Sequence, residues 1–207
     1  MNEAEIIFFI LTSLFVILIP GQDLVLVMSR GMTQGAKAGV ATAAGVSTGL
    51  LGHTLLTALG LGAILMSSEI FFTLLKYVGA AYLSYLGLKL IFSPVQEFSL
   101  ENNDPRPLGK LFITGALSNI SNPKITIFYF AFLPQFISAD VENPTLLLMI
   151  LGFSFAALTF IVKAPIGYFA GVASLWIRSR PIVIKIINRV SGAVLIGLGI
   201  KLAFEQR

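Results

Sequence analysis

The tetrapeptide Pro20-Gly21-Gln22-Asp23 interrupts an otherwise apolar stretch near the beginning of the chain. Residues 6–19 before it carry no charge, and residues 24–28 after it are apolar again. A proline and a glycine side by side release backbone groups that a lipid environment cannot satisfy. The acid at Asp23 adds a desolvation cost, which an internal partner or a water-filled cavity has to offset. The stretch therefore predicts a membrane helix that is broken at a polar site.

A second interruption of this kind occurs in the other half of the chain. It lies at Ser121-Asn122-Pro123-Lys124, and here the charged residue is a base. Discontinuous membrane helices in corresponding positions of two halves are typical of the binding sites of secondary transporters. The two breaks therefore predict one transport site that contains charges of opposite sign.

The composition is that of a membrane protein rather than a soluble domain. Of the 207 residues, 56% are hydrophobic and 12% are charged, whereas a soluble domain has about 25% charged residues. The chain has no cysteine and a single histidine, His53, which argues against disulfides, thiolate chemistry and a histidine-rich metal pathway. The bases are spread over short loops, so they indicate membrane topology rather than a nucleic-acid-binding surface.

Six apolar segments have about the 20 residues that a membrane-spanning helix needs. In the second segment, Gly45 and Gly49 form a small-xxx-small pattern that lets helix backbones approach closely. Residues 93–109 are polar and form the one boundary that the composition indicates. The predicted fold is an all-α integral membrane protein with six transmembrane helices in a single domain. We expect the segments at 5–28, 38–66, 70–92, 110–137, 145–177 and 182–204, interrupted at Pro20, Asn122-Pro123 and Lys163-Ala164-Pro165.

The distribution of bases predicts the orientation of these helices. Because bases accumulate on the cytoplasmic side, we expect the first, third and fifth loops in the cytoplasm and both termini outside. The protein would then be a multi-pass protein of the cytoplasmic membrane. An alternative with five spans, in which the first segment does not cross, would leave the N-terminus inside. Nine of the 14 bases fall in or beside these three loops: Arg30, Lys37, Lys89, Arg106, Lys110, Arg178, Arg180, Lys185 and Arg189.

The two halves of the chain resemble each other. Residues 77–90 align with residues 189–202, and Pro20 aligns with Pro123. Three spans per half is an odd number, so the two halves must enter the membrane from opposite sides. This predicts two inverted three-helix repeats, at 1–92 and 110–207, joined by a cytoplasmic linker at 93–109, with the transport site between them. The identical pairs in the aligned stretch are Val78/Val190, Ala81/Ala193, Leu83/Leu195, Leu86/Leu198, Gly87/Gly199, Lys89/Lys201 and Leu90/Leu202.

Over essentially the whole chain, these motifs resemble those of the LysE/RhtB family of amino-acid exporters. Pro20-Gly21-Gln22-Asp23 is similar to the family's Pro-Gly-Pro motif, with Gln22 in place of the second proline. The fourth span carries the family's Asn122-Pro123-Lys124 and, later, Pro134-Gln135-Phe136. The resemblance implies efflux of amino acids or close derivatives, driven by the proton gradient, and leaves the substrate open. Further matches to the family pattern are Gly45, Gly49, His53, Gly60, Lys76, Gly79, Ala80, Tyr82, Leu83, Leu86 and Gly87.

The charged residues at the breaks are the candidates for binding the substrate. Asp23 would bind a substrate ammonium or carry a proton; alternatively, it is the N-cap of the half-helix that begins after Gly21. Lys124 would bind a substrate carboxylate at the start of its half-helix; alternatively, it forms a structural salt bridge to Asp23. Lys163 would line the same cavity or only extend toward the interface. The predicted substrate-binding residues are Pro20, Gly21, Gln22, Asp23, Asn122, Pro123, Lys124 and Lys163.

His53 is the second candidate for proton coupling, beside Asp23. A histidine side chain ordinarily changes its charge near neutral pH, so it is suited to relay protons. In the alternative interpretation, its ring bonds a backbone carbonyl between two helices.

The sequence therefore predicts a secondary-active, proton-coupled exporter of amino acids or close derivatives, which needs no cofactor and works in the lipid bilayer on a small-molecule substrate. A divalent metal-ion exporter of similar architecture is the alternative, and it would need several converging His, Asp or Cys ligands. A membrane enzyme would need a nucleophile–base pair or a metal motif, and a scaffold protein would not require paired charged breaks. We expect neither enzymatic activity nor nucleic-acid binding. The oligomeric state, including a homo-oligomer, stays open.

Overall fold

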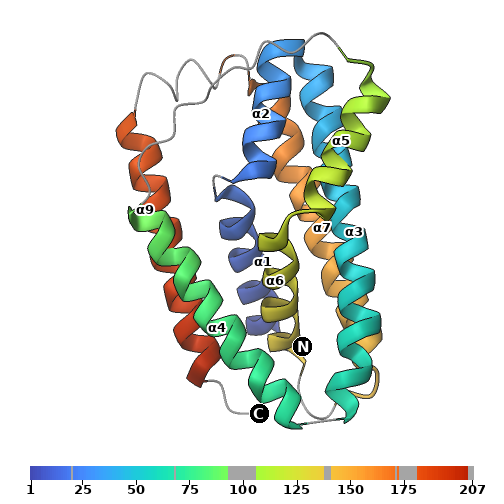
Figure 1. The fold of residues 1–207 in the computed structure, drawn as a ribbon, viewed down its shortest axis with the longest axis vertical. Coiled ribbons are helices and arrows are strands. Elements are labelled where there is room, and N and C mark those ends of the chain that lie inside the picture. Colours follow the sequence, from blue (N-terminus) through green and yellow to red (C-terminus); the bar gives the residue numbers. More distant parts are fainter. Residues whose placement is uncertain are drawn as a thin grey trace.

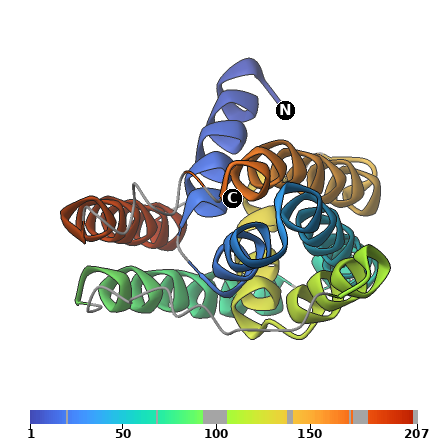
Figure 2. The same ribbon diagram turned by 90° about the horizontal axis from the view of Figure 1, so that it is seen from above.

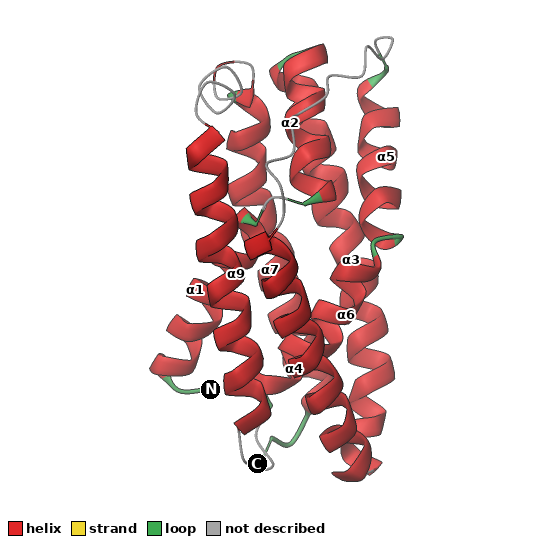
Figure 3. Ribbon diagram, turned by 60° about the vertical axis from the view of Figure 1, so that its left-hand side comes forward, coloured by secondary structure: helices red, strands yellow, loops and turns green. Residues whose placement is uncertain are grey.

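The computed structural model describes residues 1–19, 21–67, 69–92, 106–137, 141–170, 172 and 181–204. This part of the chain consists of helices and their connections, without any strand (Figure 3). The all-helical prediction is confirmed, and the helices lie close to the expected segments. They are α1 (Glu3–Leu18), α2 (Gln22–Gln34), α3 (Ala36–Ser67), α4 (Glu69–Phe92), α5 (Leu108–Ile120), α6 (Pro123–Phe132), the short 3-10 helix η1 (Leu133–Phe136), α7 (Pro144–Tyr168) and α9 (Pro181–Phe204).

Among the described helices, two are long and apolar enough to cross a bilayer. They are α7 and the part of α9 from Lys185 to Phe204. The bent pair α1 and α2 is a third if the pair counts as one broken span. Helix α3 is longer still, with 32 residues.

Both predicted helix breaks with a charged residue are present. Helix α1 ends at Leu18 and α2 begins at Gln22, and the two axes differ by 59°. Pro20 itself lies outside the described residues. Helix α5 ends at Ile120 and α6 begins at Pro123. At that first helical position, a proline's missing N–H removes no helical hydrogen bond.

The interruption expected at Lys163-Ala164-Pro165 is wrong. Helix α7 continues through these residues to Tyr168, with Pro165 inside it. Because Pro165 lies in the last turn, its missing N–H removes a hydrogen bond only near the end of the helix. The N–H of Phe169 donates to the Pro165 carbonyl at 2.9 Å as the helix ends. Of the expected span, residues 171 and 173–177 lie outside the described residues, as do residues 93–105 of the linker.

Glycines bring the helices of the interior close together. Gly45 and Gly49 of α3 pack against the backbone of α5, at Phe112 and Ala116 respectively. The small-xxx-small pattern therefore marks a helix–helix interface, as predicted.

The helices form two groups, with α1 and α6 between them. Helices α2, α3, α5 and α7 pack together, and α4 and α9 pack along each other at one side of the molecule (Figures 1 and 2). Helix α6 contacts both α3 and α4, and α1 contacts both α7 and α9. Because α1 and α6 each adjoin one of the breaks, both breaks lie between the two groups.

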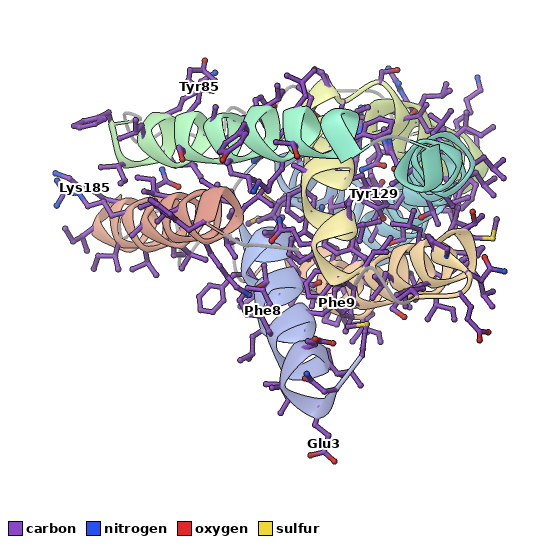
Figure 4. All side chains as sticks on the ribbon, turned by 90° about the horizontal axis from the view of Figure 1, so that it is seen from below. Glu3, Phe8, Phe9, Tyr85, Tyr129 and Lys185 are labelled. Carbon is purple, nitrogen blue, oxygen red and sulfur yellow. The ribbon has the colours of Figure 1, made fainter. Side chains whose placement is uncertain are left out.

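Large apolar side chains cover much of the outer surface. Leu59 of α3 is 63% exposed and Ile161 of α7 is 64% exposed. Tyr85 and Lys185 project outward from α4 and α9, whereas Tyr129 lies at the centre among the helices (Figure 4). An apolar surface of this extent is expected where lipid rather than water surrounds the helices.

Candidate transport site

A small cavity lies where the two helix breaks meet. Its volume is about 40 Å³, which is room for no more than a few water molecules. Its apolar wall includes Leu86 of α4, Phe128 of α6 and Leu195 of α9. The cavity therefore has a polar centre and is too small to hold an amino acid without widening. The predicted site residues that line it are Gly21, Gln22, Asp23, Asn122, Lys124 and Lys163.

Asp23 is the buried acid at this centre, with only 4% of its surface exposed. Its Oδ2 atom lies 3.6 Å from the Lys163 ammonium nitrogen and accepts a 2.7 Å hydrogen bond from the side-chain amide of Asn119. Among the described residues, none donates a hydrogen bond to its Oδ1 atom. These contacts hold the carboxylate through Oδ2, and Oδ1 is buried without a hydrogen-bond donor.

The alternative role of Asp23 as an N-cap is wrong. The N-cap of α2 is Gly21, whose backbone is extended (φ −157°, ψ 179°), and no side chain caps the helix there. Asp23 is instead the second residue of α2, and its carboxylate faces Asn119 rather than the helix backbone. An acid in the first turn still interacts favourably with the positive end of the helix dipole.

Asp23 forms its ion pair with Lys163, so the alternative salt bridge to Lys124 is also wrong. Lys163 lies on α7, a helix that packs directly against α2, and this packing brings it to Asp23. The Lys124 ammonium lies beside the break between α1 and α2, about 3.5 Å from where a β-carbon on Gly21 would be. Lys124 and Lys163 thus reach the cavity from different helices, α6 and α7.

Asn122 is the N-cap of α6. Its Oδ1 atom accepts a hydrogen bond from the backbone N–H of Lys124 at 3.1 Å, which satisfies one of the free donors at this helix end. An anion at the start of α6 would therefore find fewer free N–H groups than the sequence suggests. Its strongest partner there would be the Lys124 ammonium. Pro123 follows the N-cap but does not line the cavity.

Side-chain hydrogen bonds join the two breaks to each other. Gln22 donates from Nε2 to Ser118 Oγ at 3.1 Å, and the next residue, Asp23, accepts from Asn119. Each bond connects the first turn of α2 to the last turn of α5. The breaks in the two halves of the chain therefore meet in space, as the matching of Pro20 with Pro123 suggested.

Asn119 is a site residue that the sequence interpretation missed. It is completely buried, and it contacts Asp23 through its side chain and His53 through its backbone carbonyl. The available signal was an amide side chain in an apolar helical segment, three residues before Asn122. Such a buried amide requires a partner.

His53 lies in α3, behind the cavity rather than in its wall. Its Nε2 atom is 3.0 Å from the Asn119 carbonyl oxygen. Because a carbonyl only accepts, Nε2 carries the hydrogen in this contact. Its Nδ1 atom is 3.4 Å from the Thr126 hydroxyl. This is the bond to a backbone carbonyl that the alternative interpretation described, and the proton-relay role stays a prediction.

A helical chain with apolar spans, and with a buried cavity of opposite charges at two helix breaks, has the features of a membrane translocator. The chain belongs to the family of LysE type translocators, whose family model matches residues 14–206. This confirms the resemblance seen in the sequence. As a member of this family, the protein is a translocator rather than an enzyme.

Individual relatives match almost the full length of the chain. The uncharacterized membrane protein YrhP of Bacillus subtilis (strain 168) is 35% identical over 195 residues, which cover 89% of this chain and 91% of the relative. The leucine efflux protein of Klebsiella pneumoniae subsp. pneumoniae is 25% identical, covering 96% of this chain and 94% of its own. The leucine efflux protein of Enterobacter sp. (strain 638) is 24% identical, covering 94% and 93%. No solved structure matches the chain.

Proposed function

We propose that the protein is a secondary-active exporter of amino acids or close derivatives across the cytoplasmic membrane, driven by the proton gradient. The observation that carries this proposal is that Asp23 and Lys124 line one cavity at the meeting point of two helix breaks. A zwitterionic amino acid presents an ammonium and a carboxylate close together, so its site needs an acid and a base at short range. The names of two relatives make leucine the first substrate to test.

In this proposal, Lys124 binds the substrate carboxylate and Asp23 binds the ammonium or the coupling proton. The Oδ1 atom of Asp23 supports this role, because no described residue donates a hydrogen bond to it. The apolar wall formed by Leu86, Phe128 and Leu195 would contact the substrate side chain.

We further propose six membrane spans, arranged as two inverted three-helix repeats. An inverted repeat requires equivalent helices to run in opposite directions. Gly39 lies against Gly167 and Thr54 lies against Gly152, so α3 and its proposed equivalent α7 are antiparallel. Helices α4 and α9 are likewise antiparallel in Figure 1. Helix α1 begins and α9 ends in the lower half of the same view, which suits an even number of spans.

Transport of radiolabelled leucine in proteoliposomes with an imposed proton gradient tests the proposal. The wild-type protein should move leucine against its gradient, and cells that overexpress it should resist toxic leucine analogues. Other amino acids are then compared by competition. Failure to transport any amino acid in either assay would contradict the proposed function.

The charge assignment is tested with Asp23→Asn and Lys124→Met. Each substitution should abolish export while the protein still inserts, because a bound zwitterion loses one of its two partners. Glu142→Gln and Lys110→Met are matched controls at exposed positions, and they should export at the wild-type rate. Full export by Asp23→Asn or by Lys124→Met, at normal expression, would contradict the assignment of these two residues to the substrate charges.

A further inference from the structure

Asp23 is paired with Lys163, but the proposed substrate also brings an ammonium to Asp23. The two cations therefore compete for the same carboxylate. Both side chains are buried, with 4% and 6% of their surfaces exposed. The Lys163 ammonium lies 3.6 Å from Asp23 Oδ2, at the edge of the cavity that both residues line. Without substrate, this lysine is therefore the cation nearest to the carboxylate among the described residues.

We propose that Lys163 takes the place of the substrate ammonium on Asp23 whenever the carrier is empty. This inference rests on the proposed function, with Asp23 as the binding site of the substrate ammonium rather than of the coupling proton. A secondary carrier that performs net export has to return across the membrane without substrate. A buried carboxylate that has lost its cation is strongly unfavourable in a low-dielectric interior. Lys163 keeps Asp23 paired during that return step. When a substrate arrives, its ammonium replaces Lys163 on Asp23.

The geometry gives the two cavity lysines opposite roles. No acidic side chain among the described residues forms an ion pair with Lys124, whose ammonium lies beside Gly21. Lys124 is therefore placed to attract a substrate carboxylate, whereas Lys163 competes with the substrate ammonium for Asp23. Removing the charge of Lys124 should weaken substrate binding. Removing the charge of Lys163 should strengthen it.

Exchange and net export differ in whether the carrier has to return without substrate. Exchange of internal for external substrate needs only loaded carriers, in which the substrate ammonium occupies Asp23. Net export also needs the empty carrier to return, and only that step requires Lys163. Loss of the Lys163 charge should therefore slow net export and leave exchange intact. A structural role or a direct substrate contact would instead impair both modes.

The test compares wild-type protein, Lys163→Gln and the exposed-lysine control Lys110→Gln in proteoliposomes, with radiolabelled leucine as the probe. We expect Lys163→Gln to bind leucine several-fold more tightly and to lose net export by about tenfold or more. Exchange should stay near the wild-type rate, and the control should match wild type in all three measurements. Equal loss of exchange and net export by Lys163→Gln, or no change in either, would overturn the inference.

Lys163→Arg provides a second test, which also applies if Lys163→Gln does not insert. A guanidinium keeps the charge and binds a carboxylate through two N–H groups, so it should hold Asp23 more firmly. Leucine binding should then weaken, opposite in direction to Lys163→Gln; unchanged or tighter binding would overturn the inference. If wild-type protein transports no amino acid, the proposed function fails and this inference fails with it. Wild-type transport with the wrong response at position 163 refutes the inference alone.

Discussion

The side-chain amide of Asn119 donates a 2.7 Å hydrogen bond to Oδ2 of Asp23, across 96 positions of the sequence. The same residue accepts a contact from His53 on its backbone carbonyl at 3.0 Å. Asn119 therefore links α2, α3 and α5 at the meeting point of the two helix breaks. It holds the carboxylate of Asp23 in place without lining the cavity itself.

Asn119→Ser tests this positioning role. A serine hydroxyl is too short to reach Asp23 Oδ2, and a hydrogen bond to a charged group contributes about 1.5–3 kcal/mol. We expect the initial export rate to fall by about tenfold or more, since 1.4 kcal/mol corresponds to a factor of ten. Leucine affinity should change together with the rate, because the position of Asp23 changes.

The control for this change is Asn143→Ser, at the exposed N-cap of α7. Serine is also a good N-cap, so export should stay at the wild-type level. Export at the wild-type rate by Asn119→Ser would show that the Asn119 amide is not needed to position the Asp23 carboxylate.

His53→Gln separates the two roles considered for this histidine. A glutamine amide can donate to the Asn119 carbonyl but cannot take up and release a proton. From the contact that the structure shows, we expect His53→Gln to keep most of its gradient-driven export. His53→Leu should lose export, because the buried carbonyl then lacks its partner. Both activities, gradient-driven export and exchange, are measured in the same vesicles. If His53→Gln loses only gradient-driven export, His53 is a proton relay after all.

Membrane orientation can be measured by labelling single cysteines, since the chain has none of its own. Gly109 and Glu142 are both exposed, one in the first turn of α5 and the other just before α7. By the positive-inside rule, Gly109→Cys should be protected from an impermeant thiol reagent in right-side-out vesicles. Glu142→Cys should react. The reverse pattern would invert the topology, and labelling of both positions would contradict six spans.

Gly45→Ala should destabilise the protein. An added β-carbon at Gly45 would collide with the backbone carbonyl of Phe112 in α5, and overpacking of a tight interface typically costs about 1–3 kcal/mol. The control is Gly52→Ala in the same helix, where the nearest atom is a side-chain carbon of Ile120 at 3.6 Å. Thermal unfolding in detergent should show a lower midpoint for Gly45→Ala only. Equal midpoints would mean that α3 and α5 can separate without loss of stability.

The sequence by itself determined the helical class, both charged breaks and the translocator family. These features are local: proline and glycine interrupt a helix wherever they occur, and apolar runs of membrane length need no partner to be recognised. For the same reason, Lys124 could be assigned to a helix start before any packing was known. The break expected at Pro165 failed because a proline inside a helix can bend it without ending it, and α7 continues to Tyr168.

Only the tertiary structure decided which polar groups meet. Asp23 pairs with Lys163 rather than Lys124 because α7 packs against α2, a fact that no local pattern contains. Asn119 and His53 became parts of one network through the packing of α3 against α5 at glycines. Buried charges and amides in a membrane protein must find partners inside the protein, and the folded arrangement of distant helices determines which partners are within reach.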